Sequence, residues 1–386
     1  AIIHALDYGD DFIQILIDSK ADINAKDINH MTLLSHLISD GDYEYARWIM
    51  SKGADVNVVD GMGVPIVVNL LKNGKLELVR EMILKSASAD MKDEEGVTVL
   101  MHFISQKQTE LAKILINHGA DLNARDNWNQ FALLYAISNC PEDFCIYLID
   151  KGSGVMVKNR KGESALILAL EKNYSQLSKL LIDKGIGLRS RDRLNRTPLL
   201  VAALNGNLEL VKYIIEKGGP VDDVFNDGKS LLMLVASSDK TTPEIIEFLI
   251  RAGQKVNPQD YRGASALMYA SQLGNKEVVE KLIDFGGDFG AEDLWGKTIL
   301  LYAAEGGKIE NVKYLVKVNG RSVYLIDKDK RWTALHYAAA NNHFEVVKYL
   351  IGQKATLNAE DINGKTPFDV AGSQLIKDYL ASLGGR

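Results

Sequence analysis

The feature that most constrains this chain is a repeat with an interior period of 33 residues. The pattern D-x-x-G-x-T/S-x-L recurs along almost the whole sequence, and it is complete from Asp93, Asp260 and Asp293. Two intervals are two residues longer, and they follow Phe225 and Asp293. A period in the low thirties indicates a stacked array, in which each repeat is one supersecondary unit that buries its apolar face against its neighbours. The predicted repeats begin near residues 27, 60, 93, 126, 159, 192, 225, 260, 293, 328 and 361.

Each repeat signals the start of a helix at its sixth residue. A hydroxyl there, as at Thr98 or Ser164, can accept a hydrogen bond from the first turn of a helix. In two repeats the next residue is proline, Pro198 and Pro367, which suits the first helical position because its missing N–H is no loss there. A core-facing apolar residue follows two places after the hydroxyl, as at Leu100. We call this first helix of each repeat helix A.

A second helix, helix B, follows a short loop in each repeat. Leu208, Val211 and Ile214 stand at helical spacing with charged residues between them, which predicts an amphipathic helix. A glycine such as Gly218 then closes the helix, because a left-handed C-terminal cap is easiest without a side chain. The fourth residue of the repeat is usually glycine, or asparagine as at Asn129, which indicates a turn with positive φ. The turns are therefore predicted to project as a row of fingers.

These motifs resemble the ankyrin repeat. The likeness is carried by Gly-Ala-Asp-Val-Asn at 53–57 and by Thr-Ala-Leu-His-Tyr-Ala-Ala at 333–339, and it covers essentially the whole chain. Pro65 and Phe131 depart from the pattern where a capping hydroxyl is usual. The resemblance implies an all-α fold, an ankyrin-repeat solenoid of stacked helix-turn-helix units with projecting β-turn or hairpin fingers.

The domain organisation expected from the repeats is one ankyrin-repeat domain over residues 1–386. Residues 1–26 contain a complete helix B and only the tail of a helix A, so we expect a partial repeat there and a parent protein that continues upstream. Residues 361–386 are expected to form the C-terminal capping repeat, because Lys377, Asp378 and Ser382 make its last helix more polar.

Composition and charge limit the kinds of molecule that the protein could bind and where it could act. A formal net charge of −6 and a pI near 5.7 argue against general attraction to nucleic acid or to an anionic membrane. A mean hydropathy of −0.08 and the absence of a long apolar run predict no membrane span. Two cysteines cannot form a disulfide framework, and no secretion signal is recognisable, so a cytoplasmic location is the default expectation.

Catalytic chemistry is not indicated. The seven histidines are scattered over distant repeats with no spacing suited to zinc, so we expect no metal and no cofactor. His36 and His102 share a repeat position, which favours a surface or polar-network role over metal ligation. Cys140 and Cys145 are interpreted as small buried apolar residues, with a nucleophile as the weaker alternative. We therefore predict that the protein is not an enzyme.

The resemblance implies that a partner binds a concave surface formed by the fingers and the inner face of helix A. Three tryptophans lie in finger segments, where a turn needs no large apolar side chain, and three tyrosines occupy the tenth position of consecutive repeats. Exposed aromatic residues on one face are candidates for a binding hot spot. The alternative is structural, with the tyrosines stacked on each other and the tryptophans shielding the turns. The predicted partner-binding residues are Trp128, Tyr261, Tyr269, Trp295, Tyr302, Trp332 and Tyr337.

A second candidate surface is basic and lies in the fingers of adjacent middle repeats. It could take an acidic protein or a phosphate-bearing ligand. The alternative is an ordinary solvated surface, since Glu163 and Asp192 are interleaved with the cations. The candidate residues are Arg160, Lys161, Arg189, Arg191, Arg193 and Arg196.

The function these observations favour is that of a non-catalytic protein–protein interaction scaffold or adaptor, which binds a protein partner on the finger and helix-A face. One alternative is a targeting or ligand-sensing arm of a larger enzyme or toxin. Another is phosphate or nucleic-acid binding through the basic fingers, which would weaken steeply with salt.

Overall fold

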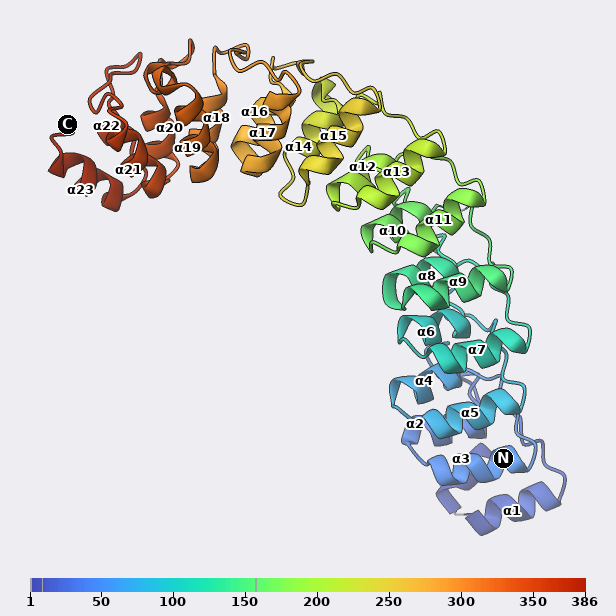
Figure 1. Ribbon diagram of the computed structural model, residues 1–386. Coiled ribbons are helices and arrows are strands. Elements are labelled where there is room, and N and C mark those ends of the chain that lie inside the picture. Colours follow the sequence, from blue (N-terminus) through green and yellow to red (C-terminus); the bar gives the residue numbers. More distant parts are fainter. Residues whose placement is uncertain (1, 9, 157) are drawn as a thin grey trace. The chain divides into compact units, whose positions relative to one another are not determined.

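The computed structural model describes residues 2–8, 10–156 and 158–386, and its contacts divide the chain into an N-terminal half, Ala1–Ile186, and a C-terminal half, Gly187–Arg386. Within each half, short helices follow one another in pairs (Figure 1). The described residues contain isolated β-bridges but no extended strand. The predicted all-α repeat fold is therefore confirmed.

The N-terminal half contains a short 3₁₀-helix and five complete helix pairs after α1. Its elements are η1 (Ile3–Tyr8), α1 (Asp10–Asp18), α2 (Leu33–Asp40), α3 (Tyr43–Ser51), α4 (Ile66–Lys72), α5 (Leu76–Leu84), α6 (Val99–Ser105), α7 (Thr109–Asn117), α8 (Ala132–Asn139), α9 (Glu142–Asp150), α10 (Ala165–Glu171) and α11 (Ser175–Asp183).

The C-terminal half continues the pattern, with two further 3₁₀ segments. Its elements are α12 (Pro198–Leu204), α13 (Leu208–Glu216), η2 (Asn226–Gly228), α14 (Leu231–Ala236), α15 (Pro243–Arg251), α16 (Ala266–Leu273), α17 (Lys276–Asp284), α18 (Ile299–Gly306), α19 (Ile309–Val318), η3 (Gly320–Tyr324), α20 (Ala334–Ala340), α21 (Phe344–Gly352), α22 (Pro367–Val370) and α23 (Gln374–Ser382).

The core of each half is a seam between successive layers. The first helices of neighbouring repeats pack on each other, as α4 does on α6 and α16 on α18, and the second helices form the other side of the stack (Figure 1). The leucines predicted to face the core are buried, with Leu100 and Leu300 showing no exposed surface. No single helix pair could bury these side chains alone, so stability comes from the contacts between adjacent layers.

The predicted caps and turns set the helix boundaries. The Thr98 hydroxyl accepts the N–H of Met101 at 3.2 Å, and Pro198 and Pro367 each occupy the first turn of their helices. Asn129 has a φ of 61°, in the left-handed region predicted for the finger turn. An isolated bridge, such as that between Lys92 and Thr98, closes each of several fingers.

One predicted cap is wrong and one repeat is shifted. The Thr298 hydroxyl makes no capping hydrogen bond to α18, and this buried group has no hydrogen-bond partner among the described residues. In the finger before α20, the aspartate that closes the turn is Asp327 rather than the next residue, Lys328. The finger accommodates one additional residue there, and Arg331 takes the left-handed conformation that glycine has in other repeats.

Candidate partner-binding surface

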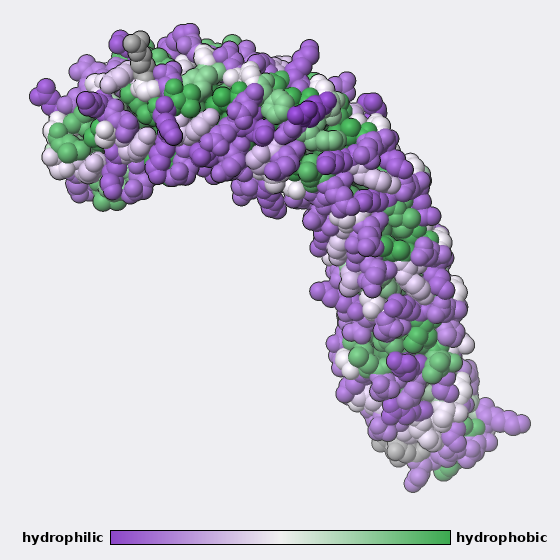
Figure 2. All heavy atoms as spheres, viewed as in Figure 1, coloured by the Kyte–Doolittle hydropathy of each residue, from purple (hydrophilic) through white to green (hydrophobic). Residues whose placement is uncertain are grey.

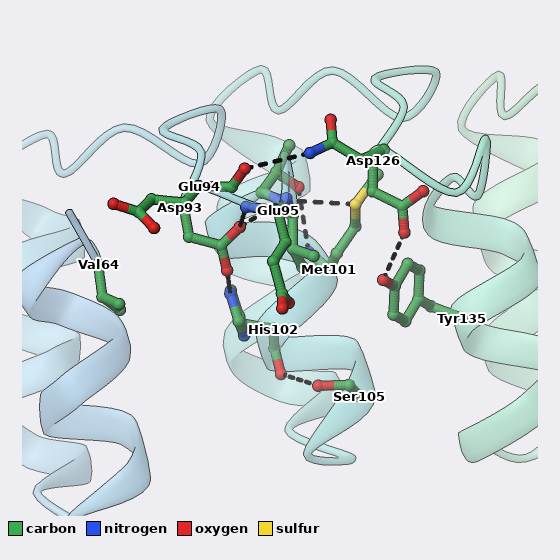
Figure 3. A network of polar contacts seen from close by, with 12 residues as sticks. Val64, Asp93, Glu94, Glu95, Met101, His102, Ser105, Asp126 and Tyr135 are labelled. Carbon is green, nitrogen blue, oxygen red and sulfur yellow. Dashed lines mark hydrogen bonds and ion pairs between the residues drawn. The ribbon is translucent and has the colours of Figure 1, made fainter. Parts of the chain in front are cut away.

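An aspartate at the start of most repeats holds the finger turn closed. In the finger before α6, Oδ1 of Asp93 accepts the backbone N–H groups of Glu95 at 3.0 Å and Val97 at 2.9 Å (Figure 3). The same two bonds occur at Asp126 and Asp260. Satisfying these N–H groups at one carboxylate oxygen fixes the shape of each finger.

The second oxygen of this aspartate binds a polar side chain on helix A. Figure 3 shows two examples, His102 pointing to Asp93 and Tyr135 pointing to Asp126. The contact ties the finger to the helix that follows it, so we call it the finger lock. The described locks join His36 to Asp27 (2.8 Å), Asn69 to Asp60 (2.6 Å), His102 to Asp93 (2.7 Å), Tyr135 to Asp126 (2.7 Å), Tyr269 to Asp260 (2.6 Å), Tyr302 to Asp293 (2.8 Å) and Tyr337 to Asp327 (3.0 Å).

The finger lock explains two sets of residues that the sequence treated separately. The polar-network role predicted for His36 and His102 is confirmed, because both bind the aspartate of their own finger. The tyrosines occupy the same position in later repeats. Sequence reasoning missed this equivalence, although the signal was present as a His, Asn or Tyr nine residues after the aspartate, or ten residues after it in the finger of Asp327.

Burial and hydrogen bonding shift the titration of the lock residues. Burial raises the pKa of Tyr302 and Tyr337 well above the ordinary value of a tyrosine, and the neighbouring carboxylate raises it further. For His102, burial lowers the pKa more than the hydrogen bond to Asp93 raises it. The locks of Tyr302 and Tyr337 are therefore made by a neutral tyrosine, and the lock of His102 by an imidazole that resists protonation.

The expectation of exposed tyrosines is wrong for two of the three. Tyr302 and Tyr337 are only 8% and 7% exposed, whereas Tyr269 is half-buried. The ring of Tyr337 packs edge-on against Trp332, at 5.1 Å between centroids. Tyr302 and Tyr337 form the floor of the finger and helix-A face. A partner could therefore touch the side chains above them rather than the two rings themselves.

Lys297, which the sequence did not single out, lies between these rings. Its ammonium lies 4.6 Å from the centroid of Tyr302 and 4.2 Å from that of Tyr337, and it forms an ion pair with Glu305 at 2.6 Å. Only 8% of the residue is exposed, so the charge depends on these partners. The Gln272 side chain donates to the same carboxylate. The cluster links α16, α18 and α20, which belong to three successive layers.

A hollow of about 300 Å³ opens above this cluster. Trp295, which is 44% exposed, forms one wall, and Arg262 and Lys330 line it from the neighbouring fingers. Four of the seven predicted binding residues thus meet at one place, namely Tyr269, Trp295, Tyr302 and Tyr337.

The remaining three predicted residues differ in their surroundings. Trp332 is half-buried, and its indole N–H donates to Asp361 at 3.1 Å, so it has a structural contact of its own. Tyr261 is 77% exposed, and its ring lies so close to Gly228 that a Cβ added there would be 2.6 Å from the ring carbons. Trp128 is 40% exposed and lies in the N-terminal half.

The fingers also carry exposed apolar residues that the sequence analysis did not collect. They occupy the second or third position of a repeat, beside the aspartate that closes the turn. Exposure of these apolar side chains to water does not stabilise the fold. Figure 2 shows hydrophobic residues as separate patches on a mainly hydrophilic surface. The finger residues concerned are Ile28 (95% exposed), Met62 (73%), Leu194 (69%), Leu294 (71%) and Ile362 (63%).

The basic candidate surface has ion pairs of its own. Arg196 binds Asp192 at 2.6 Å, and Arg191 binds Asp223 at 3.0 Å while its guanidinium lies over the ring of Phe225. Four of the six candidate residues, Arg189 to Arg196, belong to the C-terminal half, and Arg160 and Lys161 belong to the N-terminal half. The pairing agrees with the solvated-surface alternative for Arg191 and Arg196.

The two cysteines lie in the interior of the fold. Cys140 and Cys145 are buried, as interpreted from the sequence, and burial raises the pKa of both thiols, that of Cys145 to about 12. Among the described residues, no three His, Cys, Asp or Glu side chains gather in a way that could hold a metal ion. In the same part of the chain, every helix is too short or too polar to cross a membrane.

The repeats match a known family model. The model describes ankyrin repeats in three copies, and it matches residues 68–159, 147–225, 218–293, 267–361 and 300–382, well over half of the chain. This chain belongs to the ankyrin-repeat family. Proteins of this family generally mediate protein–protein interactions and are generally non-catalytic.

Two curated proteins share shorter stretches with this ankyrin-repeat protein. Alpha-latrocrustotoxin-Lt1a from Latrodectus tredecimguttatus is 47% identical over 57 residues, which is 15% of this chain and 4% of the toxin. Alpha-latroinsectotoxin-Lt1a from the same species is 43% identical over 68 residues, which is 18% of this chain and 5% of the toxin. The matched stretches thus span only a small part of each toxin.

Proposed function

We propose that this ankyrin-repeat protein is a non-catalytic scaffold that binds a protein partner on the finger and helix-A face of its C-terminal half. The observation that carries the proposal is the hollow above Lys297. Its floor is fixed by two finger locks and an ion pair, and its wall includes the exposed Trp295. A rigid floor with a large exposed aromatic residue is typical of an interface hot spot, because little side-chain entropy is lost on binding.

The aromatic residues divide into a buried set and an exposed set, and this division supports the same binding surface. Tyr302 and Tyr337 are satisfied within the fold, so they hold the surface in shape. Trp295 and Tyr261 retain large exposed areas in neighbouring fingers, so they remain available to a partner. The exposed Leu294 extends the apolar area around Trp295.

Affinity purification with the whole chain tests the proposal. The Trp295→Ala variant should lose the partner that the wild-type chain retains, without a change in melting temperature. Trp48→Ala is the matched control, because Trp48 is half-buried on α3, in a second helix of the N-terminal half. Equal partner recovery by wild type and Trp295→Ala would exclude this surface as the binding site.

A second candidate function follows from the similarity to the two toxins. We propose as an alternative that the array serves as the recognition arm of a longer, toxin-like protein. A native gene product with a further domain would support this alternative. A native product of about the 42.7 kDa of the present chain would exclude it.

A further inference from the structure

The finger turns of the first four repeats carry no lysine or arginine. A finger turn runs from the first to the fifth residue of a repeat, and each of the seven later turns contains at least one of these cations. The nearest finger cations, Lys26, Lys92 and Arg125, each precede a turn by one residue, and the first helices add only Asp40 and Lys72, which cancel. Six carboxylates against three finger cations leave a net charge of −3. The carboxylates are Asp27, Asp60, Asp93, Glu94, Glu95 and Asp126.

Glu94 and Glu95 are exposed in the turn before α6, and neither carboxylate forms an ion pair with a described residue. The two finger cations closest along the chain have other partners. Lys92 donates to the backbone carbonyl of Arg125 at 3.1 Å, and Arg125 donates to the Asn129 side chain at 2.7 Å. The charge of this acidic pair is therefore not cancelled within its own finger.

Glu95 lies on the helix-A side of its finger. In Figure 3 it extends from the turn beside His102. Burial raises the pKa of Tyr135, the hydrogen bond to Asp126 raises it further, and Glu95 is one of the carboxylates whose charge adds to the effect. The Glu95 carboxylate therefore faces α8 as well as α6.

Exposed apolar side chains flank Glu95 in the neighbouring fingers. The third residue of a finger turn faces helix A, as Trp295 does in the hollow above Lys297. Three consecutive N-terminal turns have Met62, Glu95 and Trp128 at this position. Met62 is 73% exposed and Trp128 is 40% exposed, and the indole of Trp128 forms no hydrogen bond, ring contact or cation contact with a described residue. Both side chains are thus available to a partner.

Contacts between the turns hold these three residues in a row. The backbone N–H of Asn127 donates to the carbonyl of Glu95 at 2.9 Å. On the other side, a Cβ added at Gly63 would lie 3.4 Å from Cγ of Glu94. Met62 and Trp128 are therefore each one layer from Glu95, or about 10 Å if a layer is as thick as a helix. An extended chain covers that distance with about three residues.

We propose that the finger and helix-A face of the N-terminal half binds an extended, basic segment of a partner protein, with a cationic side chain between Glu95 and Trp128 and a large apolar side chain against Met62. This surface is separate from the one proposed above in the C-terminal half. A cation there is attracted both by the carboxylate and by the face of the indole ring. Charge also favours this half, because Ala1–Ile186 holds 26 acidic and 19 basic residues, a net −7, whereas Gly187–Arg386 holds 25 and 26, a net +1.

A random peptide library displayed against the whole chain tests the inference, with segments long enough to span three fingers. Peptides that bind the Glu94→Gln/Glu95→Gln variant equally well are removed. The remaining peptides should carry a net positive charge and share a lysine or arginine with a large apolar residue about three positions away. One of them is synthesised, labelled and titrated by fluorescence anisotropy. Raising the salt from about 50 mM to about 300 mM should weaken its binding several-fold, because exposed ion pairs are screened.

Variants assign each part of the peptide to a residue of the protein. Trp128→Ala and Glu94→Gln/Glu95→Gln should each bind the peptide about tenfold more weakly. In the glutamine variant, replacing the cation of the peptide by glutamine should have no further effect, because its partner is already removed. In Met62→Ser, replacing the apolar residue of the peptide by serine should likewise weaken binding less than it does in wild type. The substituted side chains are exposed, so the melting temperature should not change.

The control is Glu77→Gln/Glu110→Gln, which removes two exposed carboxylates from the second helices of the same half and should bind like wild type. The inference is overturned if no peptide remains after the removal step, or if the remaining peptides lack a cation. It is also overturned if Trp128→Ala binds like wild type, or if the control weakens binding as much as Glu94→Gln/Glu95→Gln does. These results leave the proposed function intact, because partner recovery tests that function separately at the C-terminal half.

Discussion

Replacing Tyr302 by phenylalanine tests whether the finger locks stabilise the array. The hydroxyl of Tyr302 donates to Asp293 Oδ2 at 2.8 Å, and the two residues are 8% and 7% exposed. Phenylalanine keeps the ring under Lys297 and removes only this bond. A buried hydrogen bond to a charged acceptor contributes about 1.5–3 kcal/mol, so the apparent free energy of unfolding should fall by that amount at neutral pH.

The same variant has a defined dependence on pH. In the folded protein the pKa of Tyr302 is raised, whereas in the unfolded chain it is near the ordinary value of about 10. The contribution of this tyrosine is therefore fully present below about pH 10, and above it the folded state binds more protons than the unfolded state. For each pH unit above 10, the free energy of unfolding of the wild type should therefore fall by about 1.4 kcal/mol more than that of Tyr302→Phe. The two proteins should have similar stability by about pH 11.5.

Urea unfolding of the whole chain, followed by far-UV circular dichroism at about pH 7.5 and about pH 11.5, measures both effects. Tyr324→Phe is the matched control, because Tyr324 is 55% exposed and should respond at neither pH. The reasoning is refuted if Tyr302→Phe is as stable as wild type at neutral pH, or if the difference between them is the same at both pH values.

Three further predictions concern the core, the histidine lock and the finger turn. Leu300→Ala should cost roughly 2–5 kcal/mol in a denaturant titration, because the side chain is completely buried, and an unchanged midpoint would contradict the stacked core. His102→Asn should make the melting temperature less sensitive to acid below about pH 6.5. Because the pKa of His102 is lowered in the folded protein, its contribution to stability is present above that pH and is lost as the pH falls. Asparagine suits this position, since Asn69 makes the equivalent bond to Asp60. In the same assay, Arg331→Gly should be about 1 kcal/mol more stable than Arg331→Ala. The reason is that φ is 61° at this exposed position, a conformation that glycine adopts more easily than alanine. Equal stability of the two variants would refute that account.

The candidate site was only partly predictable. The sequence identified Trp295 and Tyr261 as finger aromatics, because a large apolar residue in a turn has no local purpose. It could not distinguish them from Tyr302 and Tyr337, since exposure depends on what the next layer places above each ring. Lys297 was missed for the same reason: its partners Glu305 and Tyr337 come from two different helices.

The sequence by itself determined the repeat, the caps and the turns, because these depend on residues close together along the chain. Thr98 and Asn129 specify a helix start and a left-handed turn through their own backbone and side-chain chemistry. The tertiary structure decided which polar groups meet and which aromatic faces remain open. Thr298 shows the limit, since its sequence position predicts a cap that the folded layer does not form. The physical reason is that local hydrogen bonds act within a few residues, whereas burial and charge pairing are set by the stacking of one layer on the next.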